Sequence, residues 1–158
     1  MSCSYGLLPN PPESVITTRL IYVAVLVGGL AGCNPQTPGS ATVNGRWYTA
    51  EQVDLGRSLF SAHCADCHGD SAKGTSDWRK ADENGNYPPP PLNGTAHTWH
   101  HPMGVLEQTI AAGGVPFGGA MPGFSEVLNK KEARAIIAYF QNTWPDEIYT
   151  RWQEIDAR

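Results

Sequence analysis

The feature that most restricts this chain is a five-residue motif at 64–68, Cys-Ala-Asp-Cys-His. Two cysteines separated by two residues are found in redox-active dithiols and in structural zinc sites. A thioredoxin-like dithiol lies among alternating strands and helices, and this chain has no strand pattern. A structural zinc site requires two further cysteine or histidine ligands at suitable spacing. Neither interpretation explains His68, which directly follows the second cysteine.

The histidine favours a third interpretation. Cys-x-x-Cys-His is the attachment signature of c-type haem, in which both thiols add across the vinyl groups of the porphyrin. The histidine beside the second thioether is then placed to bind the iron from one face. We therefore expect one haem c, bound covalently through Cys64 and Cys67, with His68 as an axial ligand of the iron.

Residues 1–32 are interpreted as an export signal. Arg19 precedes an apolar run at 20–30, and small residues follow it. A positive residue, a short apolar run and small residues at a cleavage site are typical of a secretory signal. A membrane-spanning helix is the alternative, but it needs about 20 apolar residues, and this run is much shorter.

The end of this signal, Leu-Ala-Gly-Cys at 30–33, resembles the bacterial lipobox, in which cleavage leaves a lipid-modified cysteine as the first residue. By that resemblance Cys33 carries the lipid, and Cys3 is removed with the signal. An ordinary signal followed by a cysteine is the alternative. Acyl chains on Cys33 would anchor the protein to the inner or outer membrane, facing the bacterial periplasm. Free thiols are not expected there, which agrees with their use in thioether bonds.

Composition limits the fold and the partners. The chain has 158 residues, enough for one domain, and a net charge of −4. A mildly acidic protein has no positive field for phosphates, so nucleic acid is not an expected partner. Apolar periodicity predicts an all-α domain with three main helices, at 50–63, at 103–112 and from Asn129 to Trp144.

The rest of the chain is divided by its composition. Residues 33–48 are rich in Pro, Gly, Ser and Thr, and we expect a flexible tether there. The domain proper is expected at 49–145, with long irregular loops at 69–98 and 113–124, and with the 64–68 motif in a loop after the first helix. Residues 146–158 are predicted to form an amphipathic tail. Long loops in a small domain suggest that they wrap a large apolar group.

The order of elements from 49 to 144 resembles a class I, mitochondrial-type cytochrome c. A helix, Cys-x-x-Cys-His, Pro-x-Leu-x-Gly at 90–94, a short helix, a Met-Pro loop and a last helix follow one another. The resemblance implies the class I fold, with helices and loops wrapped around one covalently attached haem. It also implies that Gly56 and Phe60 contact the last helix at Tyr139.

The same resemblance assigns roles near the haem. It implies that the Pro90 carbonyl accepts a hydrogen bond from the His68 ring, and that Leu92 packs on the haem. The segment His-Thr-Trp-His-His at 97–101 replaces a tryptophan-containing link of the family. We expect Trp99 near a haem propionate, although three histidines in this spacing are also compatible with a copper or zinc site.

The second axial ligand has several candidates with a metal-binding side chain: Met103, Met121, His97, His100 and His101. Met121 lies in Gly-Gly-Ala-Met-Pro-Gly-Phe, the Met-Pro context of the family's distal methionine. Met103 begins a predicted helix, where methionine more often fills the core. We predict Met121 as the ligand, with a histidine or Met103 as the alternative.

Ligation by histidine and methionine predicts an electron carrier rather than an enzyme. A thioether favours Fe(II), which raises the reduction potential, and both axial positions are filled. The sequence thus predicts a membrane-anchored monohaem cytochrome c that exchanges single electrons with redox proteins. A dedicated subunit of a respiratory oxidase or reductase complex is one alternative. A haem-based sensor with a labile sixth ligand is another.

Overall fold

The computed structural model describes residues 41–115 and 119–158. The predicted signal at 1–32 and the predicted lipid site, Cys33, lie outside the described residues. The described part belongs to one compact unit, which is helical and contains no strand. No helix in these two ranges is both long enough and apolar enough to cross a membrane.

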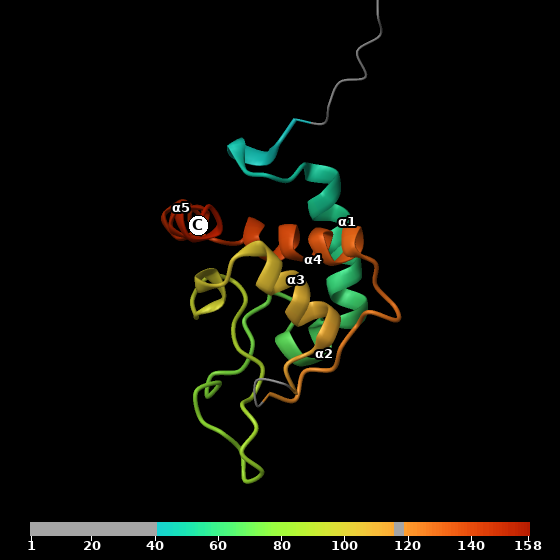
Figure 1. Cartoon of the computed structure of the whole chain (residues 1–158), viewed down its shortest axis with the longest axis vertical. Coiled ribbons are helices and arrows are strands. Elements are labelled where there is room, and N and C mark those ends of the chain that lie inside the picture. Colours follow the sequence, from blue (N-terminus) through green and yellow to red (C-terminus); the bar gives the residue numbers. More distant parts are fainter. Residues whose placement is uncertain (1–40, 116–118) are drawn as a thin grey trace, which may run out of the picture. The chain divides into compact units, whose positions relative to one another are not determined.

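Within residues 41–115 and 119–158, the regular structure consists of five α-helices and two short 3-10 helices (Figure 1). They are η1 (Val43–Gly45), α1 (Ala50–His63), α2 (Ala65–His68), η2 (Thr98–His100), α3 (Met103–Ala112), α4 (Lys130–Asn142) and α5 (Asp146–Asp156). The helices predicted at 50–63 and 103–112 are confirmed. The predicted loop at 64–68 is wrong, because the motif forms the helical turn α2 directly after α1.

The starts of α1 and α4 follow from local side-chain chemistry. Thr49 caps α1 by accepting a hydrogen bond from the backbone N–H of Gln52, and the Gln52 side chain accepts one from Thr49. Asn129 and Glu132 form the same reciprocal pair at α4. Such pairs satisfy backbone donors that have no partner within the helix. Both starts were therefore predictable from the sequence.

The sequence predicted that the last main helix ends at Trp144, but α4 ends at Asn142. Trp144 directly precedes Pro145, and the proline ring disfavours the helical conformation in the residue before it. The chain then turns and α5 begins at Asp146. The predicted amphipathic tail is thus a defined helix, with Tyr149 and Trp152 buried.

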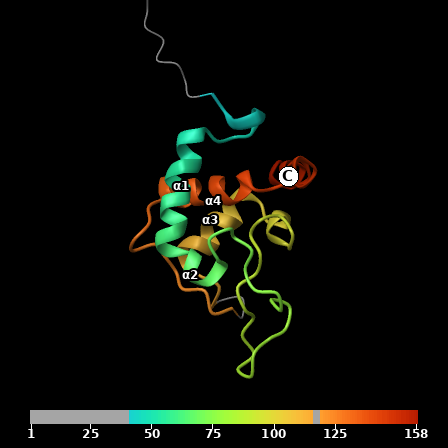
Figure 2. The same cartoon turned by 180° about the vertical axis from the view of Figure 1, so that it is seen from behind.

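Helices α1 and α4 cross in close contact, as both views show (Figures 1 and 2). A Cβ atom built on Gly56 would lie 1.8 Å from the Ala135 carbonyl oxygen, so only glycine fits at this crossing. The rings of Phe60 and Tyr139 pack with their centroids 5.0 Å apart. The contact that the resemblance implied between the first and last helices is confirmed.

The structure corrects the prediction of a flexible tether at 33–48. Of that range, residues 41–48 are described, and Arg46 is only 6% exposed. Its guanidinium donates to the carbonyls of Gln141 at 2.7 Å and Trp144 at 2.9 Å, and to Asp146 Oδ1 at 2.6 Å. Carbonyls at the end of a helix need donors from outside it. Arg46 provides them, so the end of the predicted tether is part of the domain.

Candidate functional site

His68 ends the turn α2 and is 7% exposed. Its Nδ1 lies 2.9 Å from the Pro90 carbonyl oxygen, which is the contact that the resemblance implied. A carbonyl can only accept, so Nδ1 carries the proton and Nε2 has the lone pair needed to bind a metal. Burial lowers the pKa of His68, which favours the neutral ring that binds metals.

Both cysteines belong to the turn that ends at His68: Cys64 caps it and Cys67 lies within it. Cys64 is half-buried where α1 ends, Cys67 is exposed within α2, and neither forms a disulfide. Burial, and secondarily the neighbouring Cys67, raises the pKa of Cys64 to about 11. Redox-active dithiols contain a cysteine with a lowered pKa, because the thiolate is the nucleophile. The raised pKa of Cys64 therefore gives no support to a thioredoxin-type role for that thiol.

The chain beyond α2 folds back on itself and positions the Pro90 carbonyl. The Gly74 N–H donates to the His68 carbonyl at 2.7 Å, and the Leu92 N–H donates to the Ala72 carbonyl at 2.8 Å. Gly74 has φ +59°, and a Cβ built on it would lie 2.5 Å from the Pro90 carbonyl carbon. Only glycine allows this approach. The two segments are thus held side by side around His68.

Met121 is half-buried and packs against the hydrophobic core. Its loop returns to the end of α3, where the Gly114 N–H donates to the Met121 carbonyl at 2.9 Å. Gly113 has φ +83°, and a Cβ built on it would lie 2.5 Å from the same carbonyl oxygen. The backbone of the Met121 loop is therefore in direct contact with the end of α3.

Two further contacts relate this loop to the His68 region. The rings of His63, the last residue of α1, and Phe124 lie 6.4 Å apart. Tyr87 and Gly119 form an isolated parallel β-bridge between the long loop after α2 and the loop that carries Met121. The structure thus brings the two loops that carry Pro90 and Met121 together, beside the end of α1.

The other predicted haem contacts lie at the edge of the same core. Leu92 and Trp99 are half-buried and pack against it, and so does Met103 at the start of α3. The rings of Trp99 and His100 lie 3.7 Å apart. These positions are compatible with the predicted packing roles of Leu92 and Trp99.

The histidine segment at 97–101 does not form a recognisable metal site. His97 stacks on Trp78 with ring centroids 5.1 Å apart, and its ring lies 5.4 Å from that of His101. Within the described residues, no group of three or more His, Cys, Asp or Glu side chains is arranged to hold a metal ion. The copper or zinc alternative gains no support from this arrangement.

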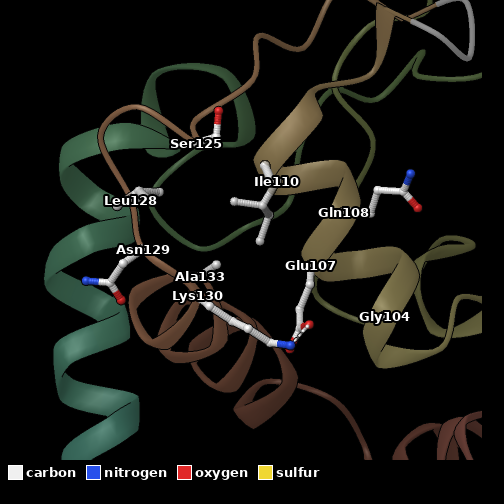
Figure 3. Close-up of a pocket in the computed structure, with 10 residues that line it drawn as sticks. Gly104, Glu107, Gln108, Ile110, Ser125, Leu128, Asn129, Lys130 and Ala133 are labelled. Carbon is white, nitrogen blue, oxygen red and sulfur yellow. Dashed lines mark ion pairs between the residues drawn. The ribbon is translucent and has the colours of Figure 1, made fainter.

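A surface cavity of about 500 Å³ lies away from these residues, between α3 and the start of α4 (Figure 3). Its side chains include Glu107, which pairs with Lys130 at 3.2 Å and with Arg134. None of the predicted haem contacts lines it. Its charged residues are already paired with each other, so we assign it no role in the site.

Sequence reasoning missed two hydrogen bonds that position the site. The Trp144 indole N–H donates to the Leu92 carbonyl at 2.7 Å, and the Tyr139 hydroxyl donates to the Asp70 carbonyl at 2.7 Å. Both bonds join the region of α4 to the chain around His68. The partners are far apart in sequence, and the only available signal was an aromatic residue at each position.

These residues fit a covalently attached haem. His68 has one ring nitrogen fixed by a carbonyl and the other available, and it directly follows the second of two cysteines that form no disulfide. A methionine loop lies on the same core. A helical fold with this site defines the class of c-type cytochromes, whose cofactor is haem c.

Comparison with known proteins identifies the family. Residues 51–140, more than half of the chain, match the family described as cytochrome c oxidase, cbb3-type, subunit III. The chain belongs to this family, which indicates a haem c protein of electron transfer. Searches of curated proteins and of solved structures found no match. The match ends before α5, so that helix lies outside the part shared with the family.

Proposed function

We propose that the protein carries single electrons on the periplasmic side of a bacterial membrane, on one haem held by Cys64 and Cys67 and ligated by His68 and Met121. The hydrogen bond from His68 Nδ1 to the Pro90 carbonyl carries this proposal. It fixes the tautomer and the ring orientation that an axial ligand requires. Bound haem c supplies reversible one-electron chemistry at its iron.

The residues of the chain tune that chemistry. The Pro90 carbonyl holds the proton at Nδ1, which makes Nε2 of His68 a stronger electron donor. The Met121 thioether is a soft ligand and favours Fe(II), which raises the reduction potential. Leu92 and Trp99 supply apolar surface that keeps water from the site.

Ligation is tested with Met121→Ala, and with Met103→Ala as the matched control. Met121→Ala is expected to abolish the weak ferric absorption band of a methionine–iron bond and to lower the reduction potential, because Fe(II) loses its thioether. Met103→Ala should keep both properties. If only Met103→Ala loses the band, the ligand assignment is wrong. If neither variant changes and a triple variant of the 97–101 histidines turns high-spin, the iron has two histidine ligands.

Anchoring is tested with Cys33→Ser. The variant should leave the membrane fraction and lose labelling by a fatty acid, since the proposed anchor is the lipid on that cysteine. A protein that stays on membranes after a high-salt wash would require another anchor, such as an uncleaved signal.

The family description favours a second candidate function. Residues 51–140 match a subunit of a cytochrome c oxidase, so the chain is alternatively a dedicated electron-transfer subunit of such a complex. Detergent extracts should then yield the protein together with an oxidase, stably in high salt. Recovery as a separate protein that exchanges electrons with several partners would favour the mobile carrier.

A further inference from the structure

The segment after Pro90 is fixed by two indole groups at the C-terminal end of the chain. The first belongs to Trp144, which is 2% exposed and donates to the Leu92 carbonyl at 2.7 Å. A Cβ built on Gly94, which has φ +89°, would lie 3.1 Å from the same indole ring. The backbone from 92 to 94 therefore lies directly on Trp144.

The second indole belongs to Trp152 in the middle of α5. It is also 2% exposed and donates to the His101 carbonyl at 3.0 Å. Near the end of the same helix, Asp156 accepts a hydrogen bond from the Met103 N–H at 2.6 Å. Three points of the chain between 92 and 103 are thus bound to Trp144 and α5.

Helix α5 is itself held in place from the other side. Asp146, at its start, pairs with the buried Arg46 guanidinium at 2.6 Å. The Tyr149 hydroxyl accepts a hydrogen bond from the Trp47 N–H at 3.0 Å. Because α5 is fixed at its start and in its middle, it can impose a position on the segment that it contacts.

The contact at Leu92 lies close in the chain to the Pro90 carbonyl, which accepts the hydrogen bond from His68. Leu92 is separated from Pro90 only by Pro91, and proline rings restrict the backbone to a narrow range of φ. A displacement of the Leu92 peptide therefore moves the Pro90 carbonyl instead of being absorbed between them. The Leu92 N–H is also bonded to the Ala72 carbonyl, so both peptide groups that flank Leu92 are held.

We propose that Trp144 and Trp152 are positioning residues that hold the Pro90 carbonyl on His68 and thereby set the reduction potential of the haem protein. The inference rests on the proposed ligation by His68. Trp144 and α5 lie beyond residue 140, where the match to the family ends.

The direction of the effect follows from the hydrogen bond. A carbonyl close to Nδ1–H makes the imidazole a stronger donor, which stabilises Fe(III) and lowers the potential. If the Pro90 carbonyl moves away, the imidazole donates less and the potential rises. The Nδ1 proton also becomes more accessible to exchange with solvent.

The test compares Trp144→Phe with Trp47→Phe in the haem-loaded full chain. Each variant keeps a ring and removes one indole donor. The Trp47 indole donates to Gln141 Oε1 at 2.7 Å and to no group of the 90–103 segment, and Trp47→Phe keeps the backbone N–H that holds Tyr149. Trp144→Phe should raise the potential and speed exchange of the His68 Nδ1 proton by about fivefold, the change that a typical net hydrogen-bond contribution supplies. Trp47→Phe should leave both values as in the wild type.

Exchange is followed by NMR on the reduced protein with labelled histidines. A drop in melting temperature for both variants, with equal exchange rates and equal potentials, overturns the proposal and leaves Trp144 a merely structural residue. If Trp144→Phe does not fold, Trp152→Phe is expected to show smaller changes in the same direction, and no change would overturn the proposal. A wild-type protein without a haem-shifted His68 ring signal would instead contradict the proposed ligation.

Discussion

The His68 region and the Met121 loop are held in different ways. The side chain of His68 is itself hydrogen-bonded to the Pro90 carbonyl, and the His68 backbone accepts from Gly74. Met121 is held through its backbone, which accepts from Gly114 at the end of α3, while its side chain packs on the core. A thioether is only a weak acceptor, so packing is what a methionine can use.

This difference predicts different consequences of mutation. Hydrogen bonds fix the orientation of the His68 ring. The position of the Met121 side chain depends instead on the conformation of the glycine-rich loop that carries it. Loss of the two cysteines beside His68 should affect whether haem is held at all. Changes in the Met121 loop should affect the spectrum and the potential of a haem that remains attached.

The largest expected effect is on attachment. The double variant Cys64→Ala/Cys67→Ala should carry no covalent haem, because both thioether positions are lost. Denatured protein on a gel, stained for haem, should show no band, and each single variant should show a weak one. Met121→Ala should keep a full band. Full staining of the double variant, or loss of the band in Met121→Ala, would contradict the assignment of haem attachment to the His68 region alone.

A smaller effect is expected at the end of α3. Gly113→Ala should displace the Met121 loop, because the new Cβ meets the Met121 carbonyl and φ is positive. Strain of this kind costs on the order of 1–3 kcal/mol of folding free energy. We expect a lower melting temperature and a weaker methionine–iron band, with covalent haem unchanged.

The matched control for that variant is Gly104→Ala in the same helix, where a Cβ meets no atom within 4 Å. Alanine at such a helical position should be neutral or stabilising by up to about 1 kcal/mol. An intact methionine–iron band in Gly113→Ala would mean that the loop adapts, and that its backbone contact does not position the ligand.

The smallest expected effect is on pH dependence. Burial, followed by repulsion from neighbouring histidines, lowers the pKa of His97 and of His101 in the folded protein. The unfolded chain then binds more protons near the usual histidine pKa of about 6.5, so stability is lost as the pH falls through that value. Melting temperatures measured on either side of it should fall less in His97→Gln/His101→Gln than in the wild type. An equal fall in melting temperature in both proteins would show that His97 and His101 do not contribute to the pH dependence of stability.

Local chemistry explains what was predicted correctly about the fold. Helix α1 begins at a capping residue, Thr49, and α3 ends at a glycine with positive φ, Gly113. Apolar spacing within each helix defines its buried face, as for Val53 and Phe60 in α1. These signals lie within a few residues of the feature that they determine, so they can be recognised without any tertiary structure.

The sequence-based predictions were wrong or incomplete where hydrogen-bond partners lie far apart in the sequence. Arg46 lies in a segment whose composition resembles a linker, yet it contacts residues around the end of α4. Trp144 was predicted to be the last residue of a helix, but its indole reaches Leu92. Neither residue carries a local pattern that indicates its partner.

The sequence by itself predicted the haem-attachment motif and the helices, because Cys64, Cys67 and His68 lie within five residues of one another and the capping signals are local. Only the tertiary structure decided that Arg46 binds the carbonyls around the end of α4, and how α5 contacts the segment that follows Pro90. A hydrogen bond requires two groups to lie within about 3 Å in a suitable direction. For groups far apart in the chain, that placement depends on the packing of all the elements between them.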